Sequence, residues 1–254
     1  MLATGPFMGS VLSLVTALTY TWVGRVLATR RLAGEERRAN HLFVLWWYSL
    51  AGLGFVTAGF GMAAAFGYTN LALHVALTNA ELLAICLALW GLTYYLAYIF
   101  MGSDRLLAPS GFFYGACYLL LLYVVAWASP TGVALGRWST QLTFARDLQS
   151  ERWVGLVLMP ILLPPLIGAI AYLTLFFRVD QPVQKYRIAL VSGSFLGWFG
   201  SSILGSITGW SRLDWWPLVS SLVGLVAAFL VLLAFHPPTW VRRRLDPSQA
   251  EVPA

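Results

Sequence analysis

Charged residues are scarce in this sequence. Only 10% of its 254 residues are Asp, Glu, Lys or Arg, compared with roughly 25% in soluble domains, while 59% are hydrophobic and the mean hydropathy is +0.74. This composition excludes intrinsic disorder. It also excludes a sizeable soluble enzymatic domain, because seven bilayer spans of about 20 residues and their connections use nearly the whole chain. We therefore expect an integral membrane protein.

Reactive side chains are equally scarce. The two cysteines, Cys86 and Cys117, lie in apolar stretches, which excludes a disulfide framework and a thiolate metal cluster. The single lysine, Lys185, lies in a predicted loop, so a covalent retinal pigment, which needs a lysine in the middle of the last helix, is excluded as well. His41 and His236 stand at the ends of predicted helices without any metal-ligand spacing. We interpret both as interfacial residues, although two imidazoles from neighbouring helices could hold haem or a metal.

Motifs of membrane-embedded enzymes are also missing. The chain has no serine nucleophile with a partner histidine, no paired intramembrane aspartates, no H-E-x-x-H zinc motif and no glycine-rich phosphate loop. We therefore expect no catalytic residues, although one glutamate and one histidine could together serve acid and base chemistry on a lipid.

Seven apolar segments are found with a window of about 19 residues. The first has no basic stretch before it and no small-residue cleavage site after it, so we interpret it as a retained helix and not as a signal peptide. Residues 1–254 are then a single all-α domain, a seven-helix membrane bundle with short loops, one 24-residue outer loop and a tail over 236–254. The predicted spans are 6–28, 42–66, 71–100, 108–128, 153–177, 187–209 and 214–235.

Basic residues predict the orientation, because cytoplasmic loops are rich in Lys and Arg. Twelve of the 16 lie in or beside the first, third and fifth loops and the tail, and four lie in the fourth and sixth loops. The N-terminus is thus predicted outside and the C-terminus inside. The net charge of +6 then reflects contact with an anionic inner leaflet and not with nucleic acid. The twelve are Arg25, Arg30, Arg31, Arg37, Arg38, Arg105, Arg178, Lys185, Arg187, Arg242, Arg243 and Arg244; the four are Arg137, Arg146, Arg152 and Arg212.

The outer loop from Ser129 to Arg152 shows a weak two-residue alternation around Gly136. Such alternation is a weak signal for a β-hairpin lying over the mouth of the bundle, and an ordinary solvated loop is the alternative that we prefer. The alternating residues are Val133, Leu135, Arg137, Ser139, Gln141 and Thr143.

Glu81 is the one acidic residue in the interior of a predicted span, whereas the other nine lie in loops, in tails or, for Asp214, at the first residue of the last span. An ionised carboxylate facing lipid is costly, so Glu81 should face the bundle and be protonated or paired. His74, Thr78 and Glu81 follow the i, i+4, i+7 spacing of one helix face and could form a short proton or cation path from the outer surface. The alternative is structural: Glu81, Thr78 and Asn79 would hydrogen-bond to neighbouring helices.

Prolines and glycines mark two other spans. Pro160, Pro164 and Pro165 stand inside the fifth span, which should be kinked or broken there and line a cavity or form a hinge, with a static kink as the alternative.

The sixth span carries a small-residue series at four-residue spacing, which we expect to pack closely, within the chain rather than against a second subunit. The series is Gly193, Gly197, Ser201, Gly205 and Gly209. On the first span, Ser13, Thr16 and Tyr20 form a mild polar face that we place inward.

Three functions fit these observations. The favoured hypothesis is a receptor-like or sensory protein of the plasma membrane that binds a small molecule or a proton within the bundle and signals through a partner docked on the basic inner rim. The first alternative is a small secondary transporter, proton-coupled through Glu81, which a faint internal similarity between residues 20–61 and 172–209 favours. The second is an accessory subunit of a larger membrane complex, docked through the glycines of the sixth span.

Overall fold

Seven long helices make up most of the chain. The computed structural model describes residues 3–30, 34–146, 152–208 and 213–245, and in these it has seven helices long and apolar enough to cross a membrane. The chain is therefore a seven-helix membrane protein. The helices are α1 (Thr4–Ala28), α2 (Gly34–Ala65), α3 (Leu71–Met101), α4 (Leu107–Ala128), α5 (Arg152–Arg178), α6 (Pro182–Thr208) and α7 (Trp216–Phe235), with a short 3-10 turn, η1 (Asp104–Leu106), before α4.

Polar ends account for the largest differences from the predicted spans. Helix α2 begins eight residues before the predicted 42–66 and α6 begins five residues before the predicted 187–209. Both extensions carry charged residues, which lower the hydropathy that locates a span without preventing a helix from continuing beyond the hydrocarbon. By contrast, α3 has clear local limits: the Asn70 side chain caps its first turn by accepting the Leu73 N–H (3.1 Å), and Gly102 ends it in the left-handed region at φ 60°.

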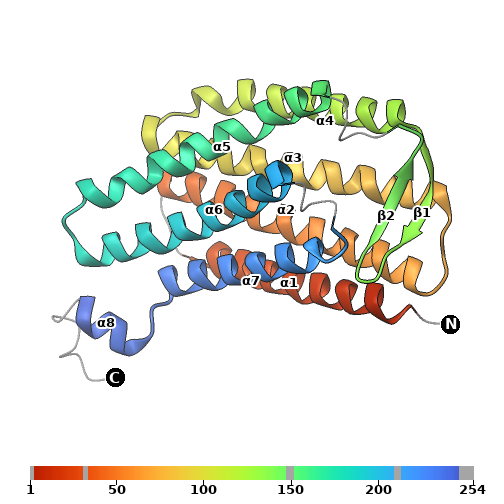
Figure 1. The fold of residues 1–254 in the computed structure, drawn as a ribbon. Helices are drawn as coiled ribbons and strands as arrows, with labels where there is room; N and C mark the ends of the chain where they lie inside the picture. Colours follow the sequence, from red (N-terminus) through yellow and green to blue (C-terminus); the bar gives the residue numbers. More distant parts are fainter. Residues whose placement is uncertain (1–2, 31–33, 147–151, 209–212, 246–254) are drawn as a thin grey trace.

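The helices are arranged as a ring that follows chain order. Helix α1 packs against α2 and α7, α2 against α3, α3 against α5, α5 against α6, and α6 against α7. Helix α4 packs chiefly against α3, at the edge of the bundle beside α5 (Figure 1). An apolar helix in lipid satisfies its backbone hydrogen bonds internally, so packing between neighbours decides the arrangement.

Large aromatic side chains fill the half of the bundle nearest the start of α2. Trp46 and Trp47 are 1% and 0% exposed, and their rings lie 4.7 Å apart between centroids. Phe195 from α6 packs on Trp46 at 5.0 Å, and Tyr20 from α1 packs on Trp47 at 5.4 Å. These contacts join α1, α2 and α6 into one core, and they bury Tyr20 as the sequence predicted.

A β-hairpin occupies the loop between α4 and α5. Strand β1 (Pro130–Leu135) pairs with β2 (Thr140–Phe144) in antiparallel register, with Val133 opposite Leu142 and an irregularity near Pro130. The weak alternation in the sequence therefore did indicate a hairpin, and the preference for a solvated loop is wrong. The chain enters it through Ser129, which adopts φ 54°.

Helix α5 runs through all three of its prolines. The structure has one helix from Arg152 to Arg178 with Pro160, Pro164 and Pro165 inside it, so the span is not broken, and a kink at these prolines stays a prediction. A proline removes one backbone donor and leaves the carbonyl four residues earlier without its helical partner. For Pro165 that carbonyl belongs to Ile161, and it accepts a hydrogen bond from the Tyr114 hydroxyl of α4 (3.2 Å). Protein contacts replace the lost bond, which lets the helix continue.

The two ends of the bundle differ. The N-terminus and the hairpin lie at one end, and a short helix α8 (Thr239–Leu245) lies at the other (Figure 1). In α8, Trp240 is exposed, Val241 is buried, and the arginines at 242, 243 and 244 are exposed. The sequence analysis predicted a tail here and no helix; an amphipathic turn of this composition suits a membrane interface.

Candidate functional site

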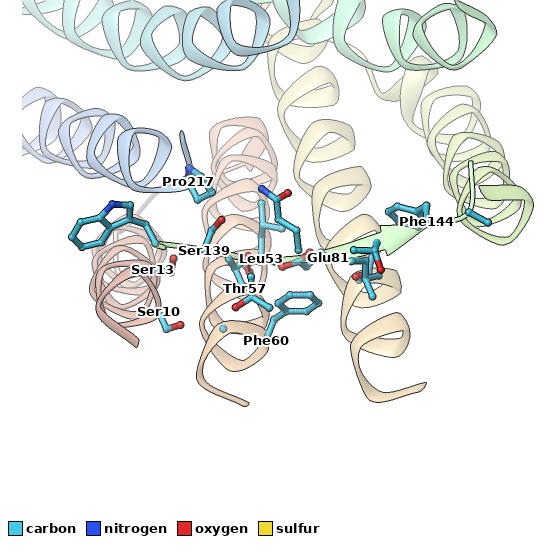
Figure 2. A pocket seen from close by; sticks show the side chains of 18 of the residues that line it. Ser10, Ser13, Leu53, Thr57, Phe60, Glu81, Ser139, Phe144 and Pro217 are labelled. Atoms are coloured by element: carbon cyan, nitrogen blue, oxygen red, sulfur yellow. Dashed lines mark hydrogen bonds between the residues drawn. The ribbon is translucent and has the colours of Figure 1, made fainter. Parts of the chain in front are cut away.

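A cavity of about 940 Å³, lined by both apolar and polar groups, lies at the hairpin end of the bundle. Helices α1, α2 and α3 form its walls, the start of α7 contributes Pro217, and residues 138–146 of the hairpin cover it. Figure 2 shows Ser10 and Ser13 on one side and Phe60 and Glu81 on the other. Its volume lies in the range of cavities that hold small organic ligands.

Glu81 reaches this cavity from α3 and is hydrogen-bonded to α2. Its Oε1 lies 2.7 Å from the Thr57 hydroxyl, which also lies 3.0 Å from the Leu53 carbonyl (Figure 2). A hydroxyl has one proton to donate and lone pairs to accept. With Glu81 ionised, Thr57 donates to the carboxylate; with Glu81 protonated, the carboxyl O–H donates to Thr57, and Thr57 donates to Leu53. The pair can therefore accommodate both protonation states without moving a helix.

Other hydroxyl groups face the same cavity. Ser13 and Thr78 line it, and neither hydroxyl has a hydrogen-bond partner within the part of the chain that the structure describes. Ser10 lines it as well, but its hydroxyl donates to the Pro6 carbonyl (2.7 Å). Ser13 and Thr78 thus offer donors and acceptors that a ligand or water can use.

Of the three residues predicted to share one face of α3, only two line the cavity. Thr78 and Glu81 line the cavity, but His74 is fully buried outside it. The His74 Nδ1 donates to the Asn70 carbonyl (2.9 Å), and its ring packs edge-on against Phe60 at 4.5 Å between centroids. Its Nε2 is buried with no partner among the described residues. His74 therefore supports the cavity wall behind Phe60 and gives no continuous path to Glu81.

Asn79 lies away from the cavity. It follows Thr78 on α3 and so points from a different part of the helix surface. Its Oδ1 is buried without a partner among the described residues, so the structure gives it no helix-to-helix hydrogen bond through that oxygen.

Asp214 ties the hairpin to the start of α7, a role that the sequence did not reveal. Its Oδ2 accepts the Trp138 N–H (2.7 Å), and its Oδ1 accepts the Ser139 N–H (2.8 Å) and the Ser139 hydroxyl (2.6 Å). Burial acts to raise the pKa of Asp214, but these hydrogen bonds, with one from the Arg137 N–H, outweigh it and hold the pKa below its ordinary 3.8. The Asp214 carboxylate and its hydrogen bonds to Trp138 and Ser139, which we call the clamp, therefore persist at neutral pH.

On the side away from Asp214, the hairpin tip packs closely against two glycines of α1. A Cβ on Gly5 would fall on the Arg137 carbonyl oxygen, and one on Gly9 would fall on the Trp138 carbonyl oxygen. Only glycine leaves room for the tip to approach the helix so closely. The tip is therefore held between α1 and the Asp214 carboxylate, which fixes the cover of the cavity.

Pro164 and Pro165 are remote from this cavity. Pro164 lines a separate, largely apolar cavity of about 260 Å³ between α3, α4 and α5, and Pro165 is buried. The polar groups nearby bind one another: the Tyr114 hydroxyl lies 2.8 Å from the Thr93 hydroxyl and donates to Ile161. The fifth span thus contributes Pro164 to the wall of this second cavity and not to the wall that holds Glu81.

The small-residue series on α6 does not pack as one continuous face. Gly193 meets only a Leu230 methyl, at 3.7 Å from a Cβ position, and nothing lies within 4 Å of such a position at Gly197. Both glycines are exposed in the structure. Ser201 bonds within its own helix, Gly205 packs tightly on the Trp216 ring, and Gly209 lies outside the described residues. Close packing within the chain is therefore limited to Gly205, because the buried face of α6 is the one that carries Phe195 and Phe199.

His41 lies near the start of α2 and His236 is the C-cap of α7, and both are exposed. Among the described residues no group of three or more His, Cys, Asp or Glu side chains is placed to hold a metal ion. The structure thus supplies no further ligand to accompany these two histidines.

Comparison with known protein families and with curated proteins finds no match to this sequence. The function is therefore argued from the geometry of the cavity alone.

Proposed function

We propose that this chain is a receptor-like membrane protein that binds a small molecule in the cavity beneath the hairpin. The supporting observation is the cavity itself: about 940 Å³, with the intramembrane carboxyl of Glu81 on its wall. Polar groups inside a membrane are costly, so they are typically found where they bind a ligand, an ion or a proton.

The rigid cover favours a binding site over an incidental gap between helices. Asp214 and the glycines of α1 hold the hairpin tip at both sides, and the strands then extend across the cavity. A preorganised site gains affinity because fewer groups must be ordered when the ligand binds.

The other half of the bundle favours a receptor over a carrier. Leu53 and Thr57 line the cavity, whereas Trp46 and Trp47, about two to three turns earlier on α2, are packed against Phe195 and Tyr20. A carrier must open a path on the second side, and this aromatic packing would have to separate for that.

Native mass spectrometry of the protein purified from its own membranes in mild detergent tests the proposal. We expect a stoichiometric small-molecule adduct on the wild type, and its loss when Gly9 is replaced by Phe, which fills the space that the hairpin tip occupies. Gly197→Phe, at an exposed position with open space, is the matched control. An adduct that survives Gly9→Phe, or a protein without any adduct that also binds nothing from an extract of its own cells, would contradict the proposal.

A proton-coupled carrier is the second candidate, favoured by the Glu81 and Thr57 pair, which accommodates both protonation states. Its test is uptake into proteoliposomes driven by a proton gradient, with the ligand found by mass spectrometry as substrate. Uptake abolished by Glu81→Gln supports the carrier, and binding without uptake supports the receptor.

Orientation and location belong to the same proposal. We infer that the hairpin end faces outward across the plasma membrane and that a receptor of this kind signals through a partner on the opposite, basic end. The arginines of α8 are exposed there and suit anionic lipid headgroups or an acidic protein surface.

A further inference from the structure

The charge on the cavity wall bears on what the cavity binds. Glu81 is its one acidic residue and Arg146 its one basic residue among the described lining residues. Arg146 is exposed at the rim, and its guanidinium lies over the Trp127 ring, 4.5 Å from the centroid. Among the described residues, no cation of the protein therefore stands beside the Glu81 carboxyl where it faces the cavity.

Glu81 also lies deep in the bundle. It follows the first residue of α3, Leu71, by ten residues, or about 15 Å along a helix, which is about half the thickness of the hydrocarbon layer. A carboxylate at that depth needs a counter-charge or a proton. Its Oε1 is bonded to Thr57, and the described residues form no ion pair with it.

The size and the other walls of the cavity point to an organic occupant and not to a bare ion. A metal or alkali ion needs oxygen ligands converging at two to three ångströms, whereas this cavity measures about 940 Å³. Phe60 and Phe144 line it beside Glu81 (Figure 2), and aromatic rings attract cations as well as apolar groups. The hydroxyls of Ser13 and Thr78 can accept additional N–H donors.

We infer that the ligand is a small organic cation whose ammonium group pairs with Glu81, while its body packs between the aromatic residues and the hairpin. This inference rests on the proposed function and specifies the chemical class of the ligand. The arrangement disfavours anions, because the one acidic group among the described lining residues is the Glu81 carboxyl and the one basic group, Arg146, is exposed and lies over the Trp127 ring.

A matched set of amines and alcohols tests the inference on the purified full-length protein. The probes are ethylamine, 1,4-diaminobutane, phenethylamine and tryptamine, each beside the alcohol of the same skeleton. A thiol-reactive dye follows unfolding, because Cys86 and Cys117 are both buried and free and react only when the chain unfolds. We expect at least one amine to raise the unfolding temperature while its alcohol has no effect.

The variant Glu81→Gln keeps the shape and the capacity to bond Thr57 but removes the charge. We expect it to unfold at a similar temperature without probe and to bind the active amine roughly 30-fold more weakly. Asp180→Asn, an exposed carboxyl in the turn between α5 and α6, is the matched control and should bind as the wild type does.

A second readout needs no variant. Dicyclohexylcarbodiimide modifies carboxyl groups in apolar surroundings, and peptide mass spectrometry locates the adduct. We expect the active amine, but not its alcohol, to protect Glu81 from modification. An alcohol as effective as its amine, unchanged binding in Glu81→Gln, or a set of amines of which none stabilises or protects would overturn the inference.

The failure of this inference is distinguishable from the failure of the proposed function. A neutral or anionic molecule found by native mass spectrometry in the cavity leaves the receptor proposal standing and removes the organic cation. No adduct in that experiment, together with no response to any amine, removes both.

Discussion

Asp214 shows how much of this structure depends on one side chain. Its carboxylate accepts hydrogen bonds from Trp138 and Ser139 in the hairpin turn, although some 75 residues separate them in the chain. Bonds to a charged acceptor are about twice as strong as neutral ones, so one residue suffices to hold the cover of the cavity to α7. Replacement or protonation of Asp214 should therefore act on the hairpin before it acts on the helices.

The clamp predicts how the hairpin responds to pH. Hydrogen bonding in the native state holds the pKa of Asp214 below 3.8, the value that applies when the hairpin is released. The stabilisation is therefore complete at pH values above about 4 and is lost as the pH falls through the lowered native pKa. Hydrogen exchange of residues 130–144, corrected for the intrinsic rate, should be constant between pH 7 and 5 and accelerate only below pH 4.

The variant Asp214→Asn is the control for this prediction. Its amide N–H₂ would face the N–H donors of the turn, so hairpin exchange should be roughly tenfold faster or more at every pH and lose the acid-dependent step. Hairpin protection equal to the wild type in Asp214→Asn would show that the clamp does not hold the cover in place.

At the scale of an element, α5 shows how a helix in lipid tolerates prolines. Pro165 leaves the Ile161 carbonyl without its helical donor, and Tyr114 from α4 supplies one while also bonding Thr93 of α3. Unsatisfied backbone groups are expensive in the membrane interior, so this hydroxyl joins three helices at one point.

Tyr114→Phe should destabilise the protein by about 1 kcal/mol, because it leaves Ile161 and Thr93 without this partner. The double variant with Pro165→Ala tests the reason, since alanine restores the N–H that the Ile161 carbonyl lacks. The cost of Tyr114→Phe should then be smaller in the Pro165→Ala background than in the wild type. Equal costs in both backgrounds, measured by reversible unfolding in mixed micelles, would show that the tyrosine acts through packing alone.

Two glycines of α6 make a matched pair at the same scale. A Cβ at Gly205 would lie 2.6 Å from the Trp216 ring, whereas a Cβ at Gly197 would meet nothing within 4 Å. We expect Gly205→Ala to lower the stability by roughly 1–3 kcal/mol through overpacking and Gly197→Ala to leave it unchanged or slightly higher. Thermal unfolding of the two variants side by side measures the difference; similar losses at both positions would mean that a second subunit covers Gly197.

The limits of the sequence are clearest in the contacts between distant segments. The length of the apolar segments was enough to predict the seven spans, since a helix in lipid must be apolar around its whole surface. Alternation around Gly136 was enough to suggest the hairpin. The partners of Glu81 were not predictable: Thr57 is an ordinary residue of an apolar helix, and only the packing of α2 on α3 brings it to the carboxyl.

Helical spacing alone did not show what two of the predicted faces contact. His74 was grouped with Glu81 by helical spacing, but spacing does not show that the side chain turns behind Phe60. The α6 glycines were expected to pack closely; among the described ones Gly205 packs tightly on Trp216, whereas Gly193 and Gly197 are exposed. Periodicity identifies residues that share a face, and the neighbouring element decides what that face meets.

For the whole molecule, the fold separates two chemically different ends. The cavity, the hairpin and the N-terminus lie at one end, and α8 with its three exposed arginines lies at the other (Figure 1). Between them lies the buried core around Trp46 and Trp47, which separates the cavity from the α8 end. A ligand from outside can then reach Glu81 only if the hairpin end faces outward.

This geometry gives the orientation a direct test, with single cysteines introduced at Thr131 in the hairpin and at Arg243 in α8. The native thiols of Cys86 and Cys117 are buried, so background labelling by a membrane-impermeant maleimide should be low. Thr131→Cys should label in intact cells, whereas Arg243→Cys should label only after permeabilisation, because arginines concentrate on the cytoplasmic side. The reverse pattern would place the cavity in contact with the cytoplasm, and the ligand would then have to be an intracellular cation instead of an external one.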